Sequence, residues 1–242
     1  MNKITVYFIP FAGGNRFSFR EYVRSSPAPL NFIPLEYPGR GMRINEPLLT
    51  DTRAIVDDLY ERIKHEVEGK RYALFGHSMG ALIAFLLARK LRNCGRDLPV
   101  HVFLTGTSGP SALSREQKQR HLLDKDEFIA AVKEMGGLPD EILENEEMLE
   151  YFEPILRADF AAVETYRYVE EPPLKIRFTI VTGTEEDMSD EDIDLWRKES
   201  GDPVKFHKLP GGHFFVLNYV AEMQALITRE LLPIKKLSNY ER

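Results

Sequence analysis

Short apolar runs alternate with longer amphipathic stretches along most of the 242-residue chain. Apolar runs bounded by Gly, Pro or polar clusters are typical of strands in a sheet that is covered on both faces. They span residues 4–9, 31–36, 72–75, 100–106, 174–183 and 204–209. Helices are predicted between them, over residues 17–22, 52–68, 81–91, 190–198 and 219–232. This alternation predicts an α/β fold with one mostly parallel, doubly wound sheet.

The segment from about residue 111 to residue 168 interrupts the alternation. It contains helical patterns over residues 125–135, 140–152 and 154–168 but no convincing strand. A helical block inserted between two strands of one sheet is better explained as a cap over the strand ends than as a separate domain. Such caps exclude water and shape an apolar pocket. We therefore expect a single α/β domain over residues 1–242 with a helical lid over about 111–168.

One predicted strand-to-helix junction carries the motif Gly76-His77-Ser78-Met79-Gly80. Strand, tight turn and helix form the context in which G-x-S-x-G makes a nucleophile elbow, and glycines allow the close approach that this turn needs. Ser78 is therefore a candidate nucleophile. The backbone N–H of Met79 lies at a helix N-terminus, where it could stabilise an anion. The alternative is an ordinary glycine-bounded turn with an incidental serine.

A serine hydroxyl needs a base to remove its proton. His213 follows two glycines after the last predicted strand and precedes the C-terminal helix. This is where the chain order Ser, acid, His of elbow-type sites requires the base, so His213 is the candidate. The other histidines fit a helix surface, a charged run, a strand interior or the elbow itself. They are His65, His77, His101, His121 and His207.

The third member of such a triad is a carboxylate that orients the imidazole. The loop after the strand that ends at Gly183 offers an excess of acids, and Glu186 and Asp187 both remain candidates. The corresponding loop after the preceding strand, residues 105–109, contains no acid.

A second oxyanion donor is expected from the loop after the first strand, Pro10-Phe11-Ala12-Gly13-Gly14. Two adjacent glycines leave backbone N–H groups exposed, and elbow-type sites take their second donor from such a loop. The candidates are the N–H groups of Phe11 and Ala12. An ordinary strand-ending turn is the alternative.

Composition narrows the possible classes of protein. The net charge of −6 argues against a general nucleic-acid or anionic-membrane surface. No apolar run approaches the length of a membrane span, and no signal-peptide pattern is seen at the start. The single cysteine, Cys94, excludes an internal disulfide and fits a reducing, cytoplasmic compartment. We find no zincin-like histidine spacing, Walker loop or GxGxxG motif, so no metal or cofactor is expected.

Taken together, these motifs resemble the type II (editing) thioesterases of non-ribosomal peptide and polyketide synthesis, in the α/β-hydrolase superfamily. The resemblance runs nearly from end to end. It is carried by six phrases, two of them in the predicted lid: residues 8–14, 37–41 and 75–81, the lid phrases 135–139 and 154–159, and residues 211–215. A generic hydrolase would share the elbow and the final histidine but not the lid phrases.

The resemblance implies hydrolysis of acyl thioesters on the phosphopantetheine arm of carrier proteins, with Ser78 as nucleophile and His213 as base. The family's Gly-x-x-Asp acid pattern maps onto residues 183–186, so this chain has Glu186 where an aspartate is usual. A monomer is expected. A basic stretch over residues 115–120 is one candidate surface for the carrier, and a solvated helix face with mixed charges is the alternative. A small-ester carboxylesterase and a non-catalytic ligand-binding protein remain as alternatives.

Overall fold

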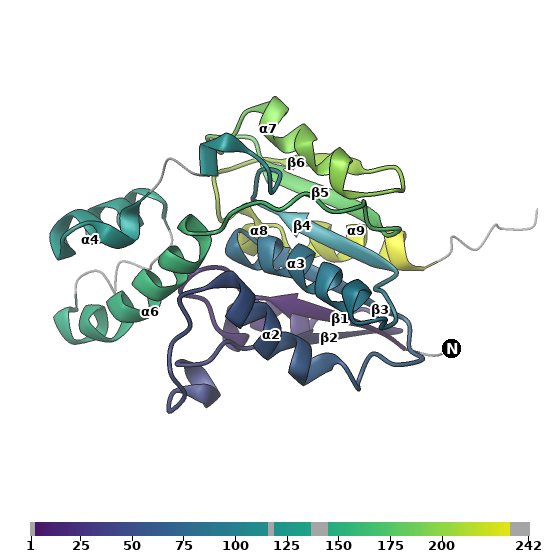
Figure 1. Cartoon of the computed structure of the whole chain (residues 1–242), viewed down its shortest axis with the longest axis horizontal. Helices are drawn as coiled ribbons and strands as arrows, with labels where there is room; N and C mark the ends of the chain where they lie inside the picture. The colour runs from purple at the N-terminus through teal and green to yellow at the C-terminus, as the bar shows by residue number, and fades with distance from the viewer. Residues whose placement is uncertain (1–2, 116–118, 137–144, 233–242) are drawn as a thin grey trace, which may run out of the picture.

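The computed structural model describes residues 3–115, 119–136 and 145–232. Its centre is a six-stranded sheet in the order β2-β1-β3-β4-β5-β6, in which every neighbouring pair is parallel (Figure 1). The strands are β1 (Ile4–Ile9), β2 (Leu30–Pro34), β3 (Tyr72–His77), β4 (His101–Thr105), β5 (Arg177–Gly183) and β6 (Lys205–Leu209). The predicted mostly parallel, doubly wound sheet is confirmed.

Helices cover both faces of this sheet, and each face has its own apolar core. One core joins the sheet to α2 (Thr52–Ile63), α3 (Met79–Asn93) and the 3₁₀ helix η5 (Leu195–Glu199). The other joins it to η1 (Arg16–Phe19), α1 (Arg20–Arg24), α8 (Phe215–Asn218) and α9 (Val220–Leu231). The remaining short elements are η2 (Gly41–Arg43), η3 (Leu113–Arg115), η4 (Arg120–Leu122) and α7 (Asp190–Asp194).

The central strands explain why the apolar runs in the sequence are continuous. All six residues of β3 and all five of β4 are buried. Within β3, Leu74 packs into the core under α2 and α3, whereas Phe75 packs into the core on the opposite face. A strand covered on both sides has no solvent face, so its sequence shows no polar alternation.

Two helices, α4 (Lys125–Glu134) and α6 (Glu146–Glu164), lie beyond one end of the sheet, apart from the layers that cover its faces (Figure 1). They share a small core of their own, made of Phe128, Val132, Leu156 and Phe160. Both belong to the segment between β4 and β5 in which the sequence predicts a lid. Parts of that segment, residues 116–118 and 137–144, lie outside the described residues and include part of the predicted helix 140–152.

The sequence predicts a break before Pro154, and this prediction is wrong. Helix α6 runs through Pro154 to Glu164 without interruption. Proline removes one backbone N–H from the helix, which leaves the carbonyl of Glu150 without its donor. Both residues are exposed, so water can bind that carbonyl, while buried side chains after Pro154 hold the helix in place. Tertiary packing therefore outweighs the local penalty.

Several predicted boundaries also shift. Strand β5 begins at Arg177, and Leu174 forms only an isolated bridge with Ser200. The predicted helix over 52–68 ends at Ile63, and the one over 190–198 divides into α7 and η5. No helix in the described ranges is both long and apolar enough to cross a bilayer.

His101 is a packed core residue, as its place within a strand suggests. It is buried in β4, its ring stacks on Phe103 with centroids 4.4 Å apart, and its Nε2 lies 2.8 Å from Thr179 Oγ1. Burial, followed by the positive charge of Arg177, lowers the pKa of His101 to about 4. The folded protein therefore holds this imidazole neutral.

This histidine should make stability depend on pH. Below about pH 6.5 the unfolded chain protonates His101 whereas the folded chain does not until about pH 4, so stability falls across that window. We expect H101F to lose about 2 kcal/mol less unfolding free energy than the wild type between pH 7 and pH 5. Urea titrations at the two pH values measure this difference, and general effects of the substitution cancel in it. Equal losses in both proteins would contradict the prediction.

Candidate active site

The nucleophile elbow joins β3 to α3 at Ser78. This residue has φ +56° and ψ −117°, and it is the one non-glycine residue with positive φ in the part of the chain that the structure describes. A Cβ at Gly76 would overlap the backbone of Gly80, and a Cβ at Gly80 would overlap the carbonyl oxygen of Ile9. The turn therefore requires glycine at both positions. Strained backbone of this kind costs about 1–3 kcal/mol and persists only where its surroundings enforce it.

His213 lies in the loop between β6 and α8, and its side chain reaches the elbow. The distance from His213 Nε2 to Ser78 Oγ is 2.9 Å, a hydrogen bond between two residues 135 positions apart. The imidazole is half-buried, with 27% of its side chain exposed. The structure thus brings together the predicted nucleophile and the predicted base.

Glu186 is the carboxylate that meets the imidazole. Its Oε1 lies 2.6 Å from His213 Nδ1, and its Oε2 accepts a hydrogen bond of 2.6 Å from the N–H of Gly183. Only 3% of the Glu186 side chain is exposed, whereas Asp187 is exposed to solvent. Of the two acids that the sequence leaves open, the geometry therefore favours Glu186.

Backbone hydrogen bonds join the loop after β5, which carries Glu186, to the loop after β6, which carries His213. The N–H of Thr184 donates to the carbonyl of Leu209, and the N–H of Glu185 donates to the carbonyl of Gly211. These bonds continue the pairing of β5 with β6 beyond the strand ends. They fix the separation of Glu186 and His213 independently of the nucleophile.

His77 lies beside the base but is directed elsewhere. Its Nδ1 lies 2.9 Å from Thr105 Oγ1, and its ring centroid is 4.9 Å from that of His213. Burial, followed by the charge of His213, depresses the pKa of His77 well below its usual value. The neutral ring of His77 packs against the ring of His213 and places no positive charge beside it.

The candidate oxyanion donors lie at the same end of the sheet. Met79 is the first residue of α3, and its N–H accordingly has no partner within the helix. The loop after β1 passes directly over the elbow, because the carbonyl oxygens of Ile9 and Pro10 are the atoms that a Cβ at Gly80 would meet first. Among the hydrogen bonds of the described residues, none uses the N–H of Met79, Phe11 or Ala12. These three groups remain candidates for binding an oxyanion.

Sequence reasoning missed a buried ion pair next to this loop. A loop arginine such as Arg40 is expected by default to be solvated, but only 3% of its side chain is exposed and Asp159 of α6 is fully buried. Arg40 Nη1 and Nη2 lie 2.5 and 2.7 Å from the two oxygens of Asp159. Burial acts to lower the Arg40 pKa, but the hydrogen bonds to Asp159 and its negative charge, together with smaller contributions from Tyr37 and Tyr151, outweigh burial, and the pKa is raised. Both residues lie in phrases that carry the family resemblance, yet 119 positions separate them and no local pattern predicts their pairing.

The basic stretch suggested as a docking surface is engaged within the protein at both described ends. Arg115 donates to the carbonyl oxygens of Ser108 and Gly109, and burial lowers its pKa to about 10. Arg120 lies 3.6 Å from the carboxylate of Glu164. Residues 116–118 lie outside the described residues. The two arginines therefore do not form the free basic surface that the sequence suggested.

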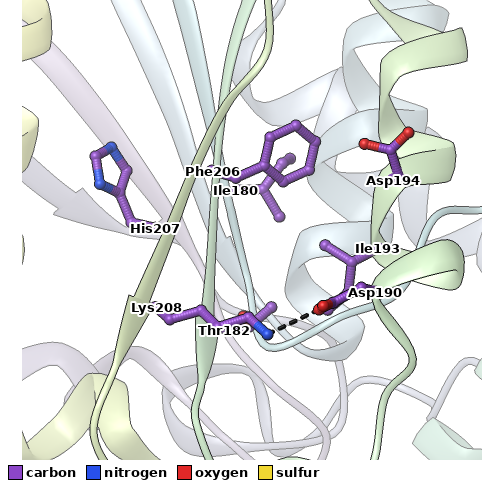
Figure 2. Close-up of a pocket in the computed structure, with 8 residues that line it drawn as sticks. All are labelled: Ile180, Thr182, Asp190, Ile193, Asp194, Phe206, His207 and Lys208. Carbon is purple, nitrogen blue, oxygen red and sulfur yellow. Dashed lines mark hydrogen bonds and ion pairs between the residues drawn. The ribbon is translucent and has the colours of Figure 1, made fainter.

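A surface hollow of about 220 Å³ lies between strands β5 and β6 and helix α7 (Figure 2). Ile180 and Phe206 form its apolar floor, and an ion pair of 2.7 Å between Lys208 and Asp190 crosses its rim. Its lining includes no member of the Ser78, His213 and Glu186 chain. Within the described residues, no group of three His, Cys, Asp or Glu side chains has the geometry of a metal site.

Comparison with known proteins assigns the family. The model of the Thioesterase domain family matches residues 4–229, which is nearly the whole chain. Linear gramicidin dehydrogenase LgrE of Brevibacillus parabrevis is 34% identical over 233 residues, covering 95% of this chain and 88% of that protein.

Solved structures agree with the family assignment. ClbQ from the colibactin NRPS/PKS pathway superposes with a TM-score of 0.89 at 26% identity, covering 94% of this chain and 96% of its own. YbtT, a type II thioesterase from the yersiniabactin NRPS/PKS pathway, superposes with a TM-score of 0.85 at 28% identity, covering 95% and 93%. The resemblance indicated by the sequence motifs is confirmed, and the chain belongs to the thioesterase family of α/β hydrolases.

Proposed function

We propose that this chain is a serine thioesterase that removes acyl groups from the phosphopantetheine arm of carrier protein domains in non-ribosomal peptide or polyketide synthesis. Stalled or mis-primed acyl groups are the intended substrates. The observation that carries the proposal is the hydrogen-bonded chain from Ser78 Oγ through His213 to Glu186, with distances of 2.9 and 2.6 Å. ClbQ and YbtT, which come from NRPS/PKS pathways, support the substrate class.

In the proposed reaction, Ser78 Oγ attacks the thioester carbonyl while His213 Nε2 accepts its proton. The tetrahedral intermediate then expels the pantetheine sulfur, which takes the proton from His213 and leaves as a thiol. His213 next removes a proton from water, which attacks the acyl-serine ester. Collapse of the second intermediate returns the proton to Ser78 and releases the acid.

Each tetrahedral intermediate carries a negative oxygen. We assign it to the N–H of Met79 and to one N–H of the loop after β1, from Phe11 or Ala12. Loss of one donor in such a site typically costs roughly 10²–10³-fold in kcat. The chemistry needs no resident metal or cofactor, since the thioester is activated by hydrogen bonds alone. We expect the enzyme to act as a cytoplasmic monomer, with α4 and α6 as the lid of a single domain.

Two other functions are compatible with this scaffold. A small-ester carboxylesterase would use the same three side chains on an oxyester. A ligand-binding protein would need no reactive serine, and the hydrogen bond between His213 and Ser78 argues against it.

A pair of matched substrates tests the proposal. The enzyme is given one acyl group either as a thioester on a phosphopantetheinylated carrier domain or as a simple oxyester, and kcat/KM is measured for each. The proposal requires the carrier-bound thioester to be the better substrate. Preference for the oxyester would favour the carboxylesterase. Failure of a fluorophosphonate to label Ser78, together with absence of turnover, would favour the binding protein.

A further inference from the structure

The buried Arg40–Asp159 pair connects the helix α6 to the loop after β1. Asp159 Oδ2 accepts a hydrogen bond of 2.7 Å from the backbone N–H of Gly13, in addition to its two contacts with Arg40. Arg40 Nη1 also lies 3.4 Å from the carbonyl oxygen of Gly14. The ion pair therefore binds both glycines at the end of the loop that supplies an oxyanion donor.

Packing reinforces this attachment. Gly13 has φ +75°, and a Cβ there would overlap the side chain of Leu156, one turn before Asp159 on α6. The backbone of the loop is thus pressed directly against α6. The N–H of Gly14 donates to the carbonyl of Phe11 at 2.9 Å, which closes the loop into a tight turn.

The other end of the loop is held by Tyr37. Its hydroxyl donates to the carbonyl oxygen of Pro10 at 2.8 Å, and the guanidinium of Arg40 lies 5.2 Å from the centre of its ring. Phe11 and Ala12 therefore lie between two anchors that share Arg40. Fixing the residues on both sides limits how far either N–H can turn.

We propose that Asp159 and Arg40 are positioning residues that hold the second oxyanion donor in place, so that α6 completes the oxyanion hole. This inference rests on the proposed function of Ser78 and the loop after β1. It makes catalysis depend on the placement of α6. Displacement of this helix would remove Asp159 from Gly13 and free the loop, even with Ser78, His213 and Glu186 in contact.

A second buried ion pair provides a matched control. Arg89 and Glu199 have only 5% and 1% of their side chains exposed, and Arg89 Nη2 lies 2.7 Å from Glu199 Oε2. Glu199 also accepts a hydrogen bond of 2.8 Å from the hydroxyl of Tyr168. This pair joins α3 to η5 and does not touch the loop after β1. Its loss should affect stability in a similar way but leave the oxyanion site intact.

The test compares D159N with E199Q. In D159N one oxygen becomes an NH₂ group, which faces either Arg40 Nη2 or both Arg40 Nη1 and the N–H of Gly13, and the loss of the negative charge weakens the attachment in either case. We expect kcat on an acyl carrier thioester to fall about 10- to 100-fold, with KM within about twofold, because the lost interaction acts in the transition state. The rate at which a fluorophosphonate modifies Ser78 should fall in parallel, since its phosphoryl oxygen occupies the same site as fluoride leaves. In E199Q, kcat should remain within about twofold of wild type, even where thermal stability falls as much as in D159N.

The possible outcomes separate the two proposals. If wild type is active and D159N keeps its kcat and labelling rate, the inference fails alone. Equal loss of kcat in E199Q would also overturn it, since the effect would then reflect general stability. If the wild type neither hydrolyses the thioester nor reacts with the fluorophosphonate, the proposed function fails as well.

A milder variant decides the case in which D159N does not fold. R40K keeps the positive charge but replaces the two-pronged contact with Asp159 by a single ammonium group. A smaller fall in kcat at constant KM would support the inference. Full wild-type kcat in folded R40K would overturn it.

Discussion

Replacing Ser78 by alanine should reduce thioester hydrolysis by about 10⁴-fold or more. The hydroxyl is the group that forms the acyl-enzyme, and it is the nucleophile that lies within hydrogen-bond distance of His213 Nε2, at 2.9 Å. Residual activity would come from water activated by His213 in the intact oxyanion site. Steady-state turnover of an acyl carrier thioester, together with fluorophosphonate labelling, measures the loss.

The S78A variant should keep its fold. Alanine has the same Cβ as serine, so the left-handed backbone at position 78 gains no new strain, and we expect the free energy of unfolding to change by less than about 1 kcal/mol. S200A is a matched control, because Ser200 donates a buried hydrogen bond to Ile176 near the start of β5, away from the site. It should lose stability but not activity. Wild-type turnover in S78A would refute the serine mechanism.

The second large effect concerns the acid. E186Q should lower kcat by about 10³- to 10⁴-fold. The N–H of Gly183 is a fixed donor that selects the amide oxygen of Gln, which leaves the NH₂ group facing His213 Nδ1. That arrangement places the imidazole proton on Nε2, where it can no longer accept the proton of Ser78.

D187N is the matched neighbour for this experiment. Asp187 is exposed and one residue away, so its loss of charge should change kcat by no more than about twofold. Both variants are assayed on the same carrier thioester over a range of pH. Similar losses in the two would mean that neither carboxylate has the sole role assigned to Glu186.

The sheet could be predicted from the sequence because its inner strands β1, β3, β4 and β5 are largely buried. Burial makes these strands mostly apolar runs, and the loops beside them contain Gly or Pro, whereas the edge strand β6 is partly exposed and alternates with polar residues. In a parallel sheet, the loops that follow the strands lie at the same edge. The elbow after β3 and the His213 loop after β6 are therefore expected at one edge of the sheet, where their side chains can meet. Ser78 and His213, which are 135 positions apart, could therefore be paired from the sequence alone.

The sequence could not decide whether Glu186 or Asp187 contacts His213, because this depends on the backbone conformation of the loop after β5. The backbone bonds of Thr184 and Glu185 to the neighbouring loop turn Glu186 inward and Asp187 outward. Nothing in the local sequence fixes that turn, because both residues are acids of similar length. The Arg40–Asp159 pair was hidden for a different reason: it depends on where α6 packs, and packing between distant elements leaves no periodic signal.

Residues from opposite halves of the chain build the proposed active site. Ser78 directly follows β3, whereas Glu186 and His213 follow β5 and β6, more than a hundred residues later. During synthesis, the elbow can therefore form while the serine is still an ordinary, unreactive alcohol. The serine becomes reactive only when β5 and β6 pair and bring Glu186 and His213 to it. An incompletely synthesised chain therefore cannot attack the carrier-bound thioesters that are the proposed substrates.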